Sequence, residues 1–195
     1  LHCKTVGYHN DMYPPSAQGQ AREVPVQDQV DEYEVIGPDG YGYPIYALKQ
    51  NHKALYGSLI SEQDMAKAYD DGNPYVNRDP RFYRDIIYHG SMFKGKWINT
   101  ATGADAINAA NSTSTGYFTR KYFDGYYTKG MSGNWNFDAP LIRLATIYLV
   151  YAEAVTRSKG ATPEVYNLMN ELRARSFMAP IPPAAQTNKE LLLDY

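Results

Sequence analysis

The chain has 195 residues, and its 19 basic and 21 acidic side chains leave a formal net charge of −2. This near balance argues against nucleic-acid binding, which usually requires a surplus of Lys and Arg on one face, and no apolar run approaches the roughly 18 residues of a transmembrane helix. The single cysteine, Cys3, excludes an intrachain disulfide. The 19 tyrosines, 2 tryptophans, 15 glycines and 12 prolines are typical of a loop-rich scaffold that carries a binding surface.

Residues 1–140 are predicted to form a loop-rich, Tyr-rich segment with short helices and a two-stranded element. The spacing of Val26, Val30 and Tyr33 predicts a short amphipathic helix over residues 26–34. A second short helix is expected around residues 65–69.

The two strands of this segment are predicted at residues 82–88 and 117–123, which are rich in aromatic and β-branched side chains. Residues 95–116 lie between them and are rich in Gly, Asn, Ser and Thr. That composition predicts either a long loop with a function of its own or an insertion.

Residues 141–195 are predicted to be a helical segment of tetratricopeptide type, truncated at its C-terminal end. Its first helix begins near Leu141, is apolar nearly all round, and is therefore expected to be buried on most sides. Gly160 is placed to end it. A second helix is predicted to start at the Thr162-Pro163 pair, and a third over residues 187–195.

The predicted fold class is mostly α, with a small β element and long loops. The first two helices of the segment resemble one tetratricopeptide repeat in length. A single helix pair cannot bury its own apolar faces, so we expect this chain to be a fragment of a larger fold.

Four sequence blocks carry a family resemblance. Residues 143–154 read Arg-Leu-Ala-Thr-Ile-Tyr-Leu-Val-Tyr-Ala-Glu-Ala. Residues 77–83 read Asn-Arg-Asp-Pro-Arg-Phe-Tyr, residues 115–122 read Thr-Gly-Tyr-Phe-Thr-Arg-Lys-Tyr, and residues 168–175 end in Arg-Ala-Arg. Taken in chain order, from residue 77 to residue 175, the four blocks resemble signatures of the SusD/RagB family. The members of this family are glycan-binding outer-membrane lipoproteins with tetratricopeptide-like helix pairs.

The chain departs from the family pattern at two places. Thr146 stands where the family usually has Glu, and Ser176-Phe177-Met178 replaces the usual Ala-Gly-Leu. The Asp79-Pro80-Arg81 turn and the charged Arg143 and Glu153 are expected to make scaffold contacts.

The resemblance implies a non-enzymatic receptor at the bacterial outer membrane, exposed on the cell surface as part of a lipid-anchored protein. Its implied partners are an oligosaccharide and a SusC-like TonB-dependent transporter, with no cofactor. No lipobox precedes Cys3, so we expect the lipid anchor to lie outside this chain.

Two loop tryptophans are the centres of the predicted glycan site, because indole rings stack on the apolar faces of sugars and amides bind their hydroxyl groups. The candidate ligand-binding residues are Trp97, Asn99, Trp135, Asn134, Asn136, Tyr126 and Tyr127. The alternative is that each Trp packs its loop onto the scaffold.

Two other function classes are alternatives to a glycan receptor. A glycosidase needs two carboxylates about 5–10 Å apart, and no pair is evident; the four histidines show no metal-ligand spacing, so no metal ion is expected. The second class is a tetratricopeptide-type docking module with no sugar site of its own. An exposed Trp97 or Trp135 favours the glycan receptor, and two buried ones favour the docking module.

Overall fold

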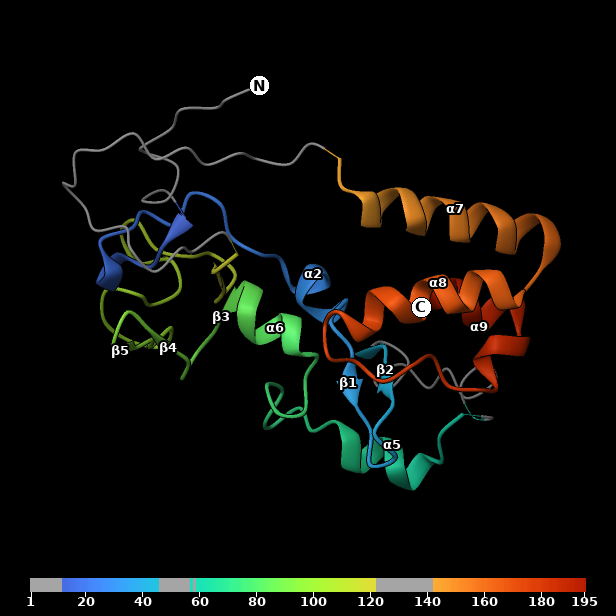
Figure 1. Cartoon of the computed structure of the whole chain (residues 1–195). Coiled ribbons are helices and arrows are strands. Elements are labelled where there is room, and N and C mark those ends of the chain that lie inside the picture. Colours follow the sequence, from blue (N-terminus) through green and yellow to red (C-terminus); the bar gives the residue numbers. More distant parts are fainter. Residues whose placement is uncertain (1–11, 46–56, 58, 122–141) are drawn as a thin grey trace. The chain divides into compact units, whose positions relative to one another are not determined.

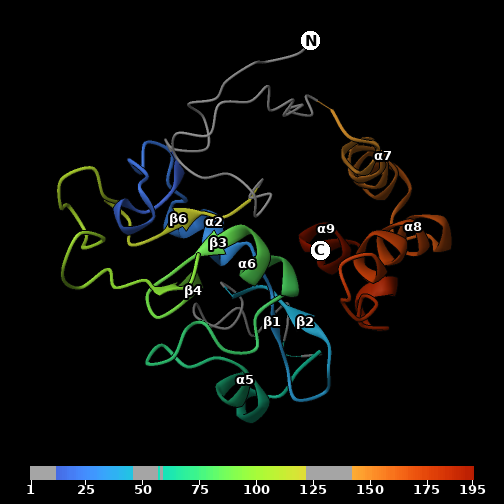
Figure 2. The same cartoon turned by 60° about the vertical axis from the view of Figure 1, so that its left-hand side comes forward.

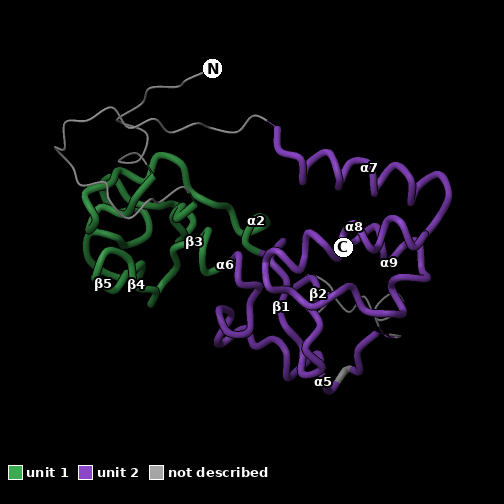
Figure 3. The backbone as a smooth tube through the Cα atoms, viewed as in Figure 1, with its two compact units in different colours: residues 1–30, 82–140 green, residues 31–81, 141–195 purple. Residues whose placement is uncertain are grey.

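The computed structural model describes residues 12–45, 57, 59–121 and 142–195. The chain forms two compact units, each built from two separate stretches (Figure 3). Unit 1 comprises residues 1–30 and 82–140, and unit 2 comprises residues 31–81 and 141–195. The sequence predicts a boundary between residues 140 and 141, and this domain boundary stays a prediction.

Unit 1 is built on two small antiparallel sheets (Figure 1). Strand β3 (Ile86–Ile87) pairs with β6 (Phe118–Thr119), and β4 (Met92–Phe93) pairs with β5 (Lys96–Trp97) in a hairpin. The 3-10 helix η1 (Pro15–Ala17) and the helix α2 (Gln27–Asp31) precede them in sequence. The core of this unit consists of buried apolar side chains from both sheets and the N-terminal stretch, namely Tyr13, Ala21, Ile87, Phe93, Ile98 and Phe118.

The prediction of a continuous strand over residues 82–88 is wrong, because helix α6 (Pro80–Asp85) occupies most of it. Pro80 stands at the first helical position, where its missing N–H costs nothing. The Asp79 carboxylate accepts a hydrogen bond from the backbone N–H of Arg81 (2.7 Å) and so caps the helix. The second predicted strand is confirmed only as Phe118–Thr119 within the part of 117–123 that the structure describes.

Unit 2 begins with a hairpin of strand β1 (Val35–Ile36) and strand β2 (Gly42–Tyr43). Helix α5 (Glu62–Ala68) follows, capped by Ser61, whose side chain accepts a hydrogen bond from the Asp64 backbone N–H (3.2 Å). Buried Val35 and Ile45 pack with Ala68 of this helix. The helix expected around residues 65–69 is therefore present and starts earlier.

The helical half of unit 2 contains α7 (Leu144–Lys159), α8 (Pro163–Ala174), the 3-10 turn η2 (Ala185–Thr187) and α9 (Lys189–Asp194). Gly160 ends α7 with φ of 84°, and the Asn188 side chain caps α9 by accepting from the Leu191 backbone N–H (3.1 Å). Helix α7 contacts both α8 and α9 (Figure 2). Their shared core is apolar and comprises Ala152, Val155, Val165, Met169, Ile181, Ala185, Leu191 and Leu192.

The expectation that α7 is buried on most sides is wrong. In unit 2, α8 and α9 cover one side of this helix, which buries only Ala152, Val155 and Thr156 of its residues. The opposite side exposes large apolar residues, among them Leu144 (64%), Ile147 (52%) and Val150 (62%). Composition shows that a helix has apolar residues on every side, but not how many neighbours pack against it.

Candidate functional site

Trp97 lies on the solvent-facing side of the β4–β5 hairpin in unit 1. Its partner across the two strands is Met92, and the second pair is Phe93 with Lys96. Successive side chains alternate between the faces of a strand, and Phe93 is buried at 1% exposure. Trp97 and Met92 consequently share the outer face, with exposed fractions of 69% and 49%. Together they form an apolar platform, which we call the Trp97 platform.

The hairpin turn holds this platform in a defined orientation. Lys94 (φ 48°) and Gly95 (φ 73°) both adopt the left-handed conformation, which is the geometry of a tight two-residue turn. The ring of Phe93 packs 5.3 Å from the ring of Tyr13, centre to centre. Lys94 Nζ lies 4.6 Å from the centre of the same Tyr13 ring.

Two further contacts fix the strands on either side of the turn. Lys96 Nζ donates a hydrogen bond to the carbonyl oxygen of Ser16 (2.8 Å). The Ile98 N–H donates to the carbonyl oxygen of Ser91 (2.9 Å), directly beyond the strand pair. The hairpin is therefore attached to the N-terminal stretch of unit 1 through Phe93 and Lys96, and the bond between Ile98 and Ser91 extends the pairing of its two strands.

Asn99 follows the platform and is exposed. Its side-chain oxygen accepts hydrogen bonds from the backbone N–H groups of Ala101 (2.9 Å) and Thr102 (3.1 Å), and its amide nitrogen donates to Thr102 Oγ1 (2.9 Å). These bonds form a local turn of the kind that Asn side chains favour. Asn99 therefore has one amide hydrogen left to offer a ligand.

The second predicted cluster lies outside the residues that the structure describes. It comprises Trp135, Asn134, Asn136, Tyr126 and Tyr127. Its role in glycan binding stays a prediction. The sequence prediction does not include Met92. The two-residue Lys94-Gly95 turn between Met92-Phe93 and Lys96-Trp97 is the signal that places Met92 opposite Trp97.

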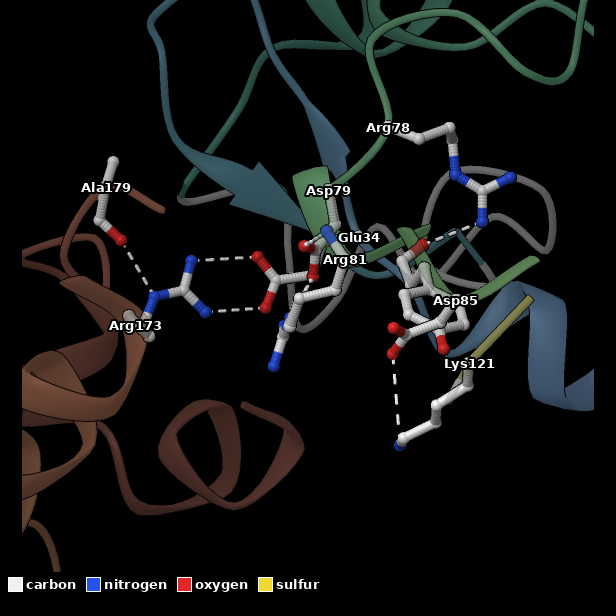
Figure 4. Close-up of polar contacts among 9 residues, drawn as sticks. Glu34, Arg78, Asp79, Arg81, Asp85, Lys121, Arg173 and Ala179 are labelled. Atoms are coloured by element: carbon white, nitrogen blue, oxygen red, sulfur yellow. Dashed lines mark hydrogen bonds and ion pairs between the residues drawn. The ribbon is translucent and has the colours of Figure 1, made fainter. Parts of the chain in front are cut away.

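Two buried carboxylates of unit 2, those of Glu34 and Asp79, each pair with an arginine (Figure 4). Arg173 donates from Nη1 to Glu34 Oε1 (2.5 Å) and from Nη2 to Oε2 (2.8 Å), and both side chains are less than a tenth exposed. The Arg81 guanidinium donates from Nε to Asp79 Oδ2 (2.7 Å) and also contacts that oxygen through Nη2. Burial alone would lower the pKa of Arg81, but its hydrogen bonds to Asp79 outweigh burial and raise the pKa.

Each of these two carboxylates is bound by an arginine side chain, so we assign both ion pairs to the scaffold. The expectation that Asp79-Pro80-Arg81 is structural agrees with the Asp79 cap and its ion pair. Arg143 and Glu153 are exposed, and Glu153 accepts a hydrogen bond from Arg157 Nε on the next turn of α7 (2.8 Å).

The described residues contain neither a metal cluster nor a membrane-spanning helix. Over residues 12–45, 57, 59–121 and 142–195, no group of three or more His, Cys, Asp or Glu side chains could hold a metal ion, and no helix has the length and apolar character to cross a membrane. A pocket of about 170 Å³ lies between α7, α8 and α9, lined among others by Thr156, Met169 and Leu192. Ligand pockets usually have about 300–1,000 Å³, so this one does not fit an oligosaccharide.

The four sequence blocks and the helix pair α7–α8 point to one class of protein, a scaffold of tetratricopeptide-like helices with a small β element. The family model of the SusD family matches residues 5–195, and the chain belongs to that family. The predicted fold class is thereby confirmed. SusD family proteins are non-catalytic glycan-binding proteins, in agreement with the expectation that the chain is not an enzyme.

Two solved structures from Bacteroides fragilis are similar to this chain. One is described as a SusD-like carbohydrate-binding protein; it is 20% identical, with a TM-score of 0.66 over 96% of this chain and 34% of that one. The other is described as a SusD-like protein; it is 25% identical, with a TM-score of 0.57 over 100% of this chain and 35% of that one. The chain thus spans about a third of the length of these structures. No curated protein matches it.

Proposed function

We propose that this chain is part of the non-catalytic oligosaccharide-binding component of a bacterial outer-membrane glycan uptake system, which delivers glycan to a SusC-like TonB-dependent transporter. Family membership supports glycan binding as the general activity. We further propose that the protein is lipid-anchored at the cell surface. One of the two similar structures is described as a carbohydrate-binding protein, which agrees with the proposal that this chain binds glycan.

The observation that carries the proposal is the exposure of Trp97 on a hairpin whose other face is buried. A sugar stacks on an indole ring that is both accessible and held still, because a mobile ring loses side-chain entropy on binding. Trp97 is 69% exposed, while the hairpin beneath it is fixed through Phe93 and Lys96. Met92 extends the apolar surface by one side chain.

The polar part of the site is proposed to come from the turn after β5 and from the second cluster. Asn99 can donate its remaining amide hydrogen to a sugar hydroxyl group. We propose that Trp135, Asn134, Asn136, Tyr126 and Tyr127 supply further stacking and hydrogen bonds. An oligosaccharide has several sugar rings. Two aromatic centres can therefore stack on an oligosaccharide at two points, whereas a monosaccharide can occupy only one of them.

A titration of intrinsic Trp fluorescence tests the proposal. Panels of plant, host and microbial oligosaccharides are added to the wild type and to the variants Trp97→Ala and Trp135→Ala. Val26→Ser, which removes another exposed apolar side chain of unit 1 (53%), serves as the matched control. We expect a saturable shift that is lost in Trp97→Ala and kept in the control; equal binding by all variants would exclude the Trp97 platform.

The docking module remains the second candidate, and the exposed side of α7 favours it. Leu144, Ile147 and Val150 offer an apolar surface that a partner helix could cover. The exposure of Trp97 favours the glycan receptor, because a docking module is expected to bury both tryptophans. The same titration separates the two, because a docking module gives no saccharide response in any variant.

A further inference from the structure

His89 joins the two chain segments that enter and leave the β4–β5 hairpin. A turn over residues 88–91 leads from β3 into β4 and is closed by a backbone hydrogen bond between its first and last residues (3.0 Å). His89 is the second residue of this turn, and it is exposed. The backbone N–H of Thr100, the residue directly after Asn99, donates to His89 Nδ1 (3.1 Å). The side chain of His89 therefore connects the turn before β4 with the stretch after β5.

This contact defines the protonation state of the His89 ring. Because the Thr100 N–H is the donor, Nδ1 must be the acceptor, and the proton of the neutral imidazole then resides on Nε2. Thr100 is 6% exposed, so water is a poor substitute for the imidazole acceptor at this N–H. A second proton, on Nδ1, turns the acceptor into a donor and breaks the bond.

The bond from Thr100 to His89 holds one side of Asn99. Before Asn99, Ile98 forms two backbone hydrogen bonds with the segment that leads into β4 (both 2.9 Å). After Asn99, the N–H of Thr100 is held by the His89 ring. Asn99 is the second residue after Trp97 and the proposed donor to a sugar hydroxyl group. Protonation of His89 consequently releases the chain on one side of a residue of the proposed site.

The charge of the His89 ring has no counter-charge among the described residues. Both polar contacts of the ring there are with Thr100, and no carboxylate in that part of the chain forms an ion pair with it. The titratable side chains of the adjoining segments contact other groups: Tyr88 stacks on Phe82, Lys94 lies over the ring of Tyr13, Lys96 donates to the Ser16 carbonyl oxygen, and Asp105 accepts from the Ser16 N–H (2.8 Å). A proton on His89 is therefore gained at the expense of the Thr100 bond.

We infer that neutral His89 is a positioning residue of the proposed saccharide site, and that protonation of its ring weakens saccharide binding at the Trp97 platform. Histidine is the side chain whose charge ordinarily changes between about pH 5 and 8. The chain around Asn99 is held on both sides when the ring is neutral and on one side when it is protonated. This inference rests on the proposed function, which supplies the saccharide.

Saccharide titrations of the wild type and three variants at about pH 7.5 and about pH 5.5 test the inference. His89→Asn places a carbonyl oxygen where Nδ1 lies, and this acceptor does not titrate. His89→Ala removes the acceptor at both pH values. His52→Asn, which removes another of the four histidines, is the matched control. The Thr100 amide resonance, followed by NMR over the same pH range without saccharide, reports on the contact itself.

We expect the wild-type affinity to fall by about threefold or more on acidification, with the same fall in His52→Asn. The affinity of His89→Asn should change by less than about twofold between the two pH values. His89→Ala should bind about threefold or more weakly than the wild type at the higher pH. The Thr100 amide should shift with pH in the wild type and stay in place in His89→Asn.

Three results would overturn the inference: an equal fall in affinity for the wild type and His89→Asn, wild-type binding that does not depend on pH, or a wild-type Thr100 amide that does not respond to pH. Saccharide binding that requires Trp97 but is independent of pH refutes this inference alone. Absent saccharide binding by the wild type at both pH values refutes the proposed function, and the inference falls with it.

Discussion

Arg173 of α8 and Glu34, just before β1, form a buried ion pair with two parallel hydrogen bonds, of 2.5 and 2.8 Å. The guanidinium carbon of Arg173 also lies 5.3 Å from the centre of the Tyr195 ring. Arg173 therefore connects its own helix with the stretch before β1, through Glu34, and with the end of α9, through Tyr195. Burial raises the pKa of Tyr195, with the Glu34 carboxylate adding to the effect.

Removing one partner of this pair should destabilise unit 2 strongly. Glu34→Ala or Arg173→Ala leaves a buried charge without its counter-charge, which typically costs about 3–5 kcal/mol. Replacing both by apolar residues, as in Glu34→Leu with Arg173→Met, should cost far less. Urea unfolding of the single and double variants measures the difference, and equal losses in all three would refute the pairing.

Asp64 gives a prediction on pH dependence. Its carboxylate accepts hydrogen bonds from Ser61 Oγ (2.7 Å) and Lys67 Nζ (3.1 Å), and these lower its pKa below 3.8. Because the folded pKa is depressed, the associated stabilisation is present above pH 3.8 and is lost as the pH falls through the folded value. Ser61→Ala should move the pKa of Asp64 back toward 3.8, as followed by carboxyl NMR; an unmoved pKa would contradict the assigned cause.

The Lys94-Gly95 turn should control the Trp97 platform. Gly95 has φ of 73° and open space where a side chain would stand, so Gly95→Ala acts through the backbone alone. We expect a loss of about 1 kcal/mol in the free energy of unfolding and a weaker saccharide response. Gly72→Ala, at a glycine without a positive φ, is the control. Full saccharide binding by Gly95→Ala would show that the turn does not position Trp97.

The two sides of α7 should respond differently to truncation. Met169 of α8, which packs against α7, is 7% exposed, and Met169→Ala should cost about 2–5 kcal/mol. Ile147 is 52% exposed, and Ile147→Ala should change stability by no more than about 0.5 kcal/mol. Chemical unfolding compares the two. A large loss for Ile147→Ala would mean that this side of α7 is covered.

Much of the helical fold can be predicted from the sequence, because the signals are local. Gly160 ends α7, Pro163 opens α8 and Asn188 caps α9, and each acts through its own backbone and nearest neighbours. The wrong strand prediction at residues 82–88 also depends on a local signal. A cap at Asp79 with Pro80 outweighs the strand preference of the aromatic residues that follow.

The candidate site is predictable only in part. That Trp97 belongs to a loop-rich aromatic region follows from composition, but its exposure depends on which side of the hairpin meets the core. Phe93 decides this by packing against Tyr13, a residue about 80 positions earlier in the chain. The Glu34–Arg173 pair likewise spans most of the chain, and no local pattern predicts a partner at that separation.

Calorimetric titration of Trp97→Ala tests most directly whether Trp97 binds sugar. The ligand is an oligosaccharide that shifts the wild-type fluorescence, and thermal unfolding checks that the variant is folded. We predict that affinity falls by about tenfold or more, with stability changed by no more than about 0.5 kcal/mol, because the side chain is 69% exposed. Wild-type affinity in a folded Trp97→Ala variant would contradict the account.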